Sequence, residues 1–170
     1  MRLRIAQTIS VTEAEGPGRR FAIWVQGCPL RCPECCNPEM LTFDGGRDIE
    51  VDHLVAEIVA AKEPGIEGIT LIGGEPFAHA EPLALLARNV RAEGLSVMVF
   101  SGYTLSELRQ MDDDAVERLL AETDILVDGP YDRAQPDTTR RWIGSTNQQI
   151  HFLSNRYSAD DSCWTTRDTL

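Results

Sequence analysis

Apolar runs and amphipathic stretches alternate along the chain between residues 50 and 128. Each short apolar run is typical of a buried strand, and each amphipathic stretch carries apolar residues at helical spacing. Strands are expected at 3–9, 21–26, 67–72, 95–100, 124–127 and 149–153, and helices at 51–62, between Pro82 and Gly94, from Thr104 and at 113–121. The alternation predicts an α/β fold in which crossover helices connect the strands of a parallel sheet.

Several helix starts carry local signals. Asp52 is expected to cap the helix at 51–62, and Pro82 suits the first turn of the next helix. Thr104 and Glu107 match a capping box, so a short helix should begin at that point.

Length and charge limit the class of protein. The chain has 170 residues, 42% apolar and 25% charged, which fits one globular domain. Its net charge of −11 disfavours binding to nucleic acid or to an anionic membrane. No apolar run approaches the ~18 residues of a membrane span, and the N-terminus has the character of a strand, not of a secretory signal. We expect a cytoplasmic protein with a core domain at 1–153 and a polar C-terminal tail at 154–170.

Polar loops follow three of the expected strands. These loops cover Gly73–Pro76, Ser101–Thr104 and Asp128–Tyr131. In sheets of parallel strands, ligands bind at the carboxyl ends of the strands. The sequence therefore predicts a ligand site where these loops meet.

Four of the five cysteines lie between residues 28 and 36, and Cys163 lies far from them. An odd count without a secretory signal is a poor disulfide framework, so a metal site is favoured. Buried reduced cysteines are one alternative, but the flanking Pro and Gly residues indicate a loop. A structural zinc knuckle is another, although it would need a second C-x2-C unit or histidines nearby. Cys163 is expected to be a free thiol.

Cys28, Cys32 and Cys35 have the spacing C-x3-C-x2-C. Three soft thiolates from one loop can bind three irons of a cubane cluster and leave the fourth iron open to a ligand. Cys36 is an awkward fourth ligand because it is adjacent to Cys35, so we interpret it as a packing residue.

Gly73, Gly74, Glu75 and Pro76 form a second motif, GGEP, directly after the strand at 67–72. Two glycines allow a backbone to approach a ligand closely. Glu75 and exposed backbone amides at a strand end can hold an ammonium group. Alone, this motif favours a structural turn, but beside the cysteine loop it indicates a binding loop.

The cysteine loop and GGEP together resemble the radical S-adenosylmethionine (SAM) superfamily. Further segments resemble, in order, the activating proteins of anaerobic ribonucleotide reductase: 16–28, 35–39, 69–77, 100–108, 124–131 and 142–150. The resemblance implies a shortened radical SAM core, which is a partial (β/α) barrel of parallel strands. It also implies that SAM is cleaved reductively at a [4Fe-4S] cluster, and that the resulting 5′-deoxyadenosyl radical generates a glycyl radical on the reductase.

The resemblance also implies roles for individual residues. Cys28, Cys32 and Cys35 would hold the cluster, and the segment Gly73–Pro76 would contact the amino group of SAM. Ser101, Gly102 and Tyr103 match a strand-end motif of the family and would lie near SAM. Asp128 and Gly129 match the next strand end, and Asp128 would also bind the cofactor. A flavodoxin or ferredoxin-like protein would donate the electron.

Departures from the family pattern leave the partner open. Cys36 stands where these activating proteins usually carry tyrosine, Ile72 replaces a small hydroxyl residue, and Gln149 stands where arginine is frequent. Another glycyl-radical enzyme, a peptide or a small molecule are alternative substrates. A non-enzymatic iron–sulfur electron carrier or a zinc-binding module would leave GGEP unexplained.

Other residues allow two interpretations each. Asn147 and Gln148 match a late family segment and have either a functional or a structural role. Arg19 and Arg20 face either an acidic partner or, as we prefer, solvent in a turn. Trp142 is either a partner anchor or a core residue. His79 is expected to be a partly exposed residue at a helix start.

Overall fold

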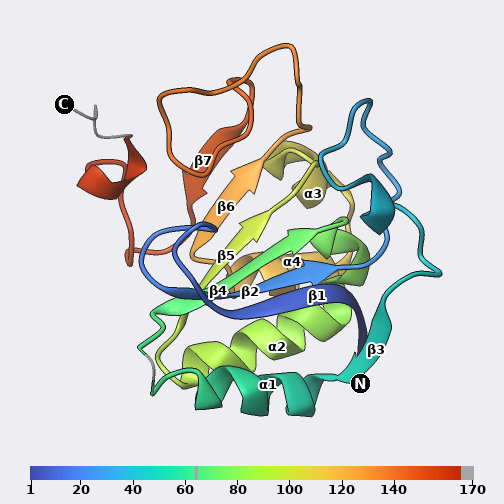
Figure 1. Ribbon diagram of the computed structural model, residues 1–170, viewed down its shortest axis with the longest axis vertical. Helices are drawn as coiled ribbons and strands as arrows, with labels where there is room; N and C mark the ends of the chain where they lie inside the picture. The colour runs from blue at the N-terminus through green and yellow to red at the C-terminus, as the bar shows by residue number, and fades with distance from the viewer. Residues whose placement is uncertain (64, 166–170) are drawn as a thin grey trace.

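The computed structural model describes residues 1–63 and 65–165, and a seven-stranded sheet runs through it (Figure 1). The strands are β1 (Arg2–Thr12), β2 (Arg20–Val25), β3 (Arg47–Glu50), β4 (Gly68–Gly73), β5 (Ser96–Phe100), β6 (Ile125–Asp128) and β7 (Gln149–Phe152). The helices are α1 (Val51–Ala60), α2 (Ala80–Ala92), α3 (Leu105–Gln110) and α4 (Asp114–Ala121), with short 3-10 helices η1 (Pro38–Met40), η2 (Pro76–His79) and η3 (Ser162–Trp164).

The strands are ordered β3-β1-β2-β4-β5-β6-β7 across the sheet. Helical crossovers connect β2, β4, β5 and β6, and these four strands are parallel. The outer strands β1, β3 and β7 run antiparallel to their neighbours. The predicted α/β fold with a parallel core is confirmed. In the described chain β3 and β7 are the two edges of the sheet, so it stays open like a partial barrel.

Both faces of the parallel strands are buried, which explains their continuous apolar runs. Side chains alternate between the faces: Ile69 and Leu71 of β4 point to the helix-covered core, whereas Ile72 packs with Trp24 on the opposite face. Helices α1 and α2 lie side by side against the first face (Figure 1). The second face is left to loops, and these loops build the candidate site.

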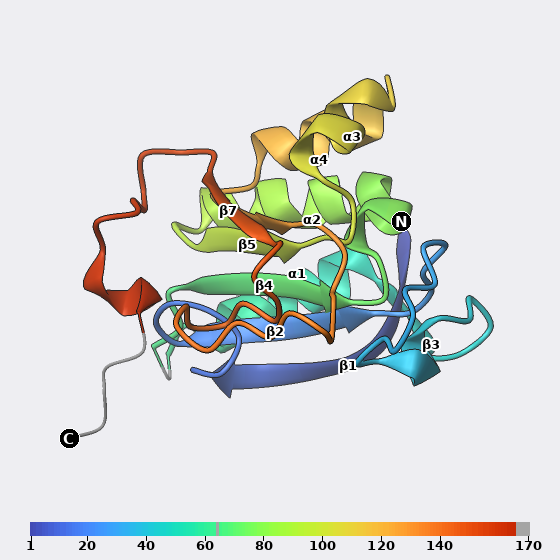
Figure 2. The ribbon, with the colours of Figure 1, turned by 90° about the horizontal axis from the view of Figure 1, so that it is seen from above.

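The described part of the C-terminal segment packs against the sheet. Trp164 is buried and makes an edge-on ring contact with Phe152 of β7, at 5.4 Å between centroids. The Tyr157 hydroxyl lies 2.9 Å from the Ser96 hydroxyl at the start of β5. This segment lies at the end of the molecule opposite β3 (Figure 2). The proposed division between 1–153 and 154–170 stays a prediction, and 166–170 lie outside the described residues.

Helix starts agree with the sequence in part. The capping box of Thr104 and Glu107 at α3 is confirmed, and Pro82 lies in the first turn of α2. The expectation that Asp52 caps α1 is wrong: α1 follows directly on β3, so Glu50 is the N-cap residue, without a side-chain hydrogen bond. The Val51 N–H donates instead to the Met1 carbonyl, at 2.9 Å.

Two further features were not expected. β3 is polar in sequence and forms because it pairs with β1, placing Ile49 opposite Leu3. The expectation of a solvated Arg20 is wrong, because its side chain is fully buried. Its guanidinium donates to the hydroxyls of Thr70 (2.7 Å) and Ser96 (3.0 Å), beneath the loop that connects β1 to β2.

Within residues 1–63 and 65–165, no helix is long and apolar enough to cross a bilayer.

Candidate functional site

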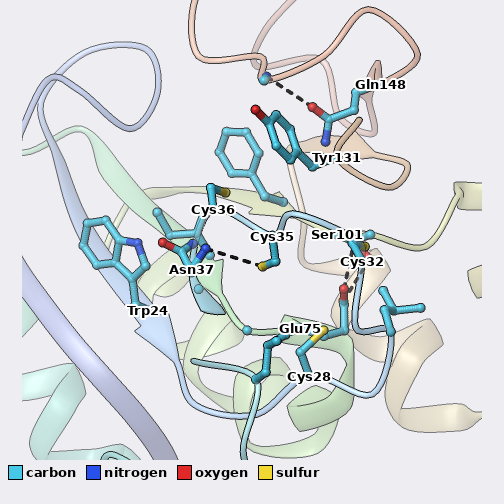
Figure 3. Close-up of a pocket in the computed structure, with 18 of the residues that line it drawn as sticks. Trp24, Cys28, Cys32, Cys35, Cys36, Asn37, Glu75, Ser101, Tyr131 and Gln148 are labelled. Atoms are coloured by element: carbon cyan, nitrogen blue, oxygen red, sulfur yellow. Dashed lines mark hydrogen bonds between the residues drawn. The ribbon is translucent and has the colours of Figure 1, made fainter. Parts of the chain in front are cut away.

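A cavity of about 350 Å³ opens at the carboxyl ends of the parallel strands (Figure 3). The cysteine loop after β2, the glycine loop after β4 and the loop after β5 all reach it. The predicted residues in its lining are Cys28, Cys32, Cys35, Gly73, Gly74, Glu75, Ser101 and Gly102. The expectation that the strand-end loops meet in one place is therefore confirmed.

The thiols of the cysteine loop are unpaired and face a common space. Cys28 is buried, whereas Cys32 and Cys35 are partly exposed. Burial raises the pKa of the Cys28 and Cys32 thiols, although backbone N–H groups of Leu30 and Arg31 oppose this for Cys28. The Asn37 N–H donates to Cys35 Sγ at 3.4 Å. These N–H groups are suited to stabilise sulfur once it is ionised by a metal.

The three thiols of the cysteine loop suit an iron–sulfur cluster. Within the described residues, no three Cys, His, Asp or Glu side chains converge closely enough to hold one metal ion. A [4Fe-4S] cluster makes a different demand, because each thiolate binds a separate iron of a larger object. Three thiols around one cavity meet that demand.

Cys36 does not behave as a packing residue. Its side chain is exposed and lies in the cavity lining beside Cys35. The interpretation of Cys36 as a packing residue is wrong, because its side chain is exposed. Cys163 is a free thiol, as expected.

Gly73 and Gly74 are required by close packing against β2. Gly73 has a φ of +108°, and a Cβ on Gly74 would lie 2.2 Å from the Gly27 carbonyl oxygen. The backbone N–H groups of Gly74 and Glu75 donate to the carbonyls of Val25 and Gly27, both at 2.9 Å. The glycines thus bring the β4 loop directly against the start of the cysteine loop.

Glu75 is buried beside the cavity, and its carboxylate joins two loops. One oxygen accepts from the Phe77 N–H (3.0 Å) and the Ser101 hydroxyl (2.8 Å), and the other accepts from the Gly102 N–H (2.9 Å). Burial raises the pKa of this carboxyl to about 7, although the three hydrogen bonds oppose the shift. A negative charge at this position is costly without a cation, so the site is suited to an ammonium group.

Three predicted residues lie outside the cavity lining. Pro76 begins η2 and is buried, and the Tyr103 N–H donates to the Ser101 hydroxyl. Asp128 lines a neighbouring groove between α3 and β7, where it accepts from the Leu105 N–H at 2.7 Å and lies 2.9 Å from His151 Nε2. Its predicted role near SAM stays a prediction.

Aromatic residues also line the cavity. Tyr131 belongs to one of the predicted loops, whereas the sequence did not assign Trp24, Phe100 and Trp142 to the site. Trp142 takes a φ of +65° and makes an edge-on contact with Trp164 at 5.5 Å, so it belongs to both the core and the site. Trp24 lies within the apolar run of β2, so its sequence context indicates only a buried strand residue. Tyr131 directly follows Asp128-Gly129-Pro130, so its place after a strand end was the available signal.

Comparisons with known proteins agree with this geometry. A family model described as a 4Fe-4S single cluster domain matches residues 14–151. The anaerobic ribonucleoside-triphosphate reductase-activating protein of Vibrio cholerae is 32% identical over 155 residues, covering 85% of this chain and 95% of that protein. The protein of the same name from Salmonella typhimurium is 30% identical, covering 89% and 99%. The chain belongs to the family of anaerobic ribonucleoside-triphosphate reductase-activating proteins.

Membership of this reductase-activating family confirms the resemblance found in the sequence and supports a [4Fe-4S] cluster and SAM as the cofactors. The family also includes a protein of phage T4 that is 26% identical, covering 88% of this chain. The crystal structure of QueE from Escherichia coli overlaps with 61% of this chain and 54% of that chain, at 19% identity and a TM-score of 0.48.

Proposed function

We propose that this protein is a radical SAM enzyme that generates a glycyl radical on an anaerobic ribonucleotide reductase. One observation carries the proposal: three free thiols with the spacing C-x3-C-x2-C share a cavity with the loop of Gly73, Gly74 and Glu75. The family match over residues 14–151 supports the cluster, and the names of the relatives support the partner.

Cys28, Cys32 and Cys35 would hold the cluster through their thiolates. When bound, the cluster supplies the electron that cleaves SAM into methionine and the 5′-deoxyadenosyl radical. Three cysteines would leave one iron of the cluster open to the amino acid end of SAM. This would explain why the cysteine loop lies beside a loop suited to bind an ammonium group.

The β4 loop would orient the amino group of SAM. Glu75 uses both oxygens in bonds to the protein, so its role is to shape the loop and to supply negative charge. Both effects favour an ammonium group at the backbone of Gly73 and Gly74. Apolar side chains such as Trp24 and Phe100 line the same cavity and would exclude water from a reactive radical.

A flavodoxin or ferredoxin-like protein would supply the electron. We place the reaction in the cytoplasm, where thiols stay reduced.

Ser101 and Gly102 hold the Glu75 carboxylate in place through their hydrogen bonds. Tyr103 and Asp128 do not line the cavity, so they would support the site indirectly: the Tyr103 N–H binds the Ser101 hydroxyl, and Asp128 lies in the neighbouring groove.

The test is product analysis after anaerobic reconstitution with iron and sulfide, SAM and a strong reductant. Release of 5′-deoxyadenosine by the wild type, but not by Cys32→Ala, supports radical SAM chemistry. A glycyl radical signal in electron paramagnetic resonance after addition of the reductase supports the partner. A wild type that holds its cluster and cleaves no SAM, with or without the reductase, contradicts the proposal.

A further inference from the structure

Gln26 lies at the base of the cysteine loop. The chain leaves the sheet after Val25, at the end of β2, and returns to it at β3 (Figure 1). Gln26 is the first residue of the connecting segment, and its polar side chain is buried. Its Nε2 amide donates to the carbonyls of Glu39 (3.1 Å) and Thr42 (2.6 Å). One side chain therefore ties the start of the cysteine loop to its end.

Backbone hydrogen bonds continue this closure toward the cysteines. The Gly27 N–H donates to the Met40 carbonyl at 2.8 Å, and the Cys28 N–H donates to the Leu41 carbonyl at 3.1 Å. Cys28 belongs to the closed base itself, and the other two predicted cluster ligands lie between the paired ends. Because the ends are fastened, the segment that carries the thiols has fewer conformations to lose when it binds a cluster.

Gln26 also connects the cysteine loop to the glycine loop after β4. Its backbone carbonyl lies 2.7 Å from Nε2 of His79, the last residue of η2, which begins directly after Glu75. A carbonyl oxygen only accepts hydrogen bonds, so the His79 ring must carry a proton on Nε2 to make this bond. Gln26 thus binds the end of the cysteine loop through its side chain and the segment after the glycine loop through its carbonyl.

A primary amide is well suited to this position. Its NH2 group carries two donors, one for each of the two carbonyls that it binds. The loop end packs directly against the amide, because a Cβ added at Gly45 would lie 2.7 Å from Gln26 Nε2. An apolar side chain of the same length would fill this space and leave both carbonyls without their donor.

We propose that Gln26 is a positioning residue that holds the cysteine loop closed and thereby keeps the cluster bound. The proposal rests on the assignment of Cys28, Cys32 and Cys35 as cluster ligands under the proposed function. Its physical basis is preorganisation, since thiols held near their bound arrangement lose less conformational entropy on binding. A loop with fastened ends also opens less often to release iron.

The first measurement is amide hydrogen exchange in the full chain without iron. Gln26→Met keeps the length of the side chain and removes both donors. Exchange at the N–H groups of Gly27 and Cys28 reports the opening of the loop base, because both are paired with the loop end. We expect exchange at these two groups to become about tenfold faster in Gln26→Met, with exchange in β5 unchanged.

The second measurement is the rate at which the reconstituted cluster is lost to an iron chelator, followed by the absorbance of the cluster under anaerobic conditions. Gln26→Met should lose its cluster about tenfold faster than the wild type. Thr123→Val is the matched control, because it removes a buried hydrogen bond from the Thr123 hydroxyl to the Leu119 carbonyl (2.7 Å) outside the cavity. This control should lose stability in urea unfolding and keep the wild-type rate of cluster loss.

A second variant keeps the test informative if Gln26→Met does not fold. His79→Phe removes only the hydrogen bond to the Gln26 carbonyl and retains an aromatic ring. It should accelerate both exchange at the loop base and cluster loss, by less than Gln26→Met does.

A role in fold stability alone would make Gln26→Met and Thr123→Val behave alike. Rates of exchange and of cluster loss that match the wild type, or that match Thr123→Val, would therefore overturn the proposal. Faster exchange at the loop base without faster cluster loss would overturn it as well. Both measurements are made without SAM, so they are separate from the proposed function, which fails if a wild type that holds its cluster releases no 5′-deoxyadenosine.

Discussion

The Ser101 hydroxyl donates a hydrogen bond of 2.8 Å to the buried carboxylate of Glu75, and this bond joins the carboxyl ends of β4 and β5. The same carboxylate accepts from the Gly102 N–H, so two consecutive residues of one strand end bind the side chain of another. These hydrogen bonds between Glu75 and the end of β5 stabilise the cavity wall beside Gly73 and Gly74. A change at either residue should therefore affect both stability and cofactor binding.

The first prediction concerns pH. Burial raises the pKa of Glu75 from its ordinary value of 4.5 to about 7 in the fold. Between these values the unfolded chain is ionised at this position while the folded chain keeps its proton. The free energy of unfolding should therefore fall as pH rises through this window and level off above it, by about 3 kcal/mol for the full shift.

Glu75→Gln, which does not titrate, isolates this effect in urea unfolding measured from pH 5 to 8. The difference in unfolding free energy between wild type and variant should decrease with pH. Glu57→Gln, at an exposed position of α1, should give a constant difference. Parallel curves for wild type and Glu75→Gln would show that Glu75 keeps an ordinary pKa in the fold.

The second prediction concerns Ser101→Ala. The variant removes a donor to the Glu75 carboxylate and an acceptor for the Tyr103 N–H, so it should cost about 1–3 kcal/mol of stability. Since the lost donor favoured the ionised carboxylate, the pKa of Glu75 should rise further. The check is the same urea series, in which the pH window should move upward. Ser10→Ala on the exposed face of β1 should leave it in place.

The third prediction separates the adjacent thiols. Cys32→Ala should abolish cluster assembly, because three thiolates are needed for three irons. Cys36→Ala should retain the cluster, because the adjacent Cys35 and Cys36 are poorly placed to bind two irons of the same cluster. Iron and sulfide content after anaerobic reconstitution is the measurement. Equal loss of iron in both variants would make Cys36 a ligand and argue against the three-cysteine assignment.

Much of the fold could be predicted because its signals are local. Strands β4, β5 and β6 are buried on both faces and appear as apolar runs, and the capping box at Thr104 lies within four residues. Parallel strands place their loops at one edge, so the meeting of Glu75 with Ser101 followed from topology.

The remaining features depend on contacts between distant segments. The need for glycine at position 74 comes from the register that places Val25 opposite Gly73, which no local pattern contains. The edge strand β3 exists through its pairing with β1. Trp24 lines the cavity together with Tyr131 and Trp142, which come from the segment between β6 and β7. Nothing near Trp24 in the sequence indicates that these distant residues share a cavity with it.

The last prediction concerns Arg20, whose burial the sequence did not reveal. Its guanidinium donates to Thr70 Oγ1, to Ser96 Oγ and to the carbonyls of Pro17 and Ile69, at 2.6–3.2 Å. Arg20→Met fills a similar volume but leaves these acceptors without their donor, so we expect a loss of about 3 kcal/mol or more. Arg20→Lys offers fewer donors in a different geometry and should lose less.

Urea unfolding measures the Arg20 effect, with Arg109→Met at an exposed position of α3 as the control. The buried charge itself carries a desolvation cost, so two terms of opposite sign compete in Arg20→Met. Equal stability of Arg20→Met and the wild type would mean that removing the buried charge offsets the lost hydrogen bonds. A loss of stability in Arg20→Met that Arg109→Met does not share would mean that the guanidinium stabilises the contact between β2, β4 and β5 at their amino ends. Glu75 and Ser101 make the corresponding contact at the carboxyl ends, beside the cavity.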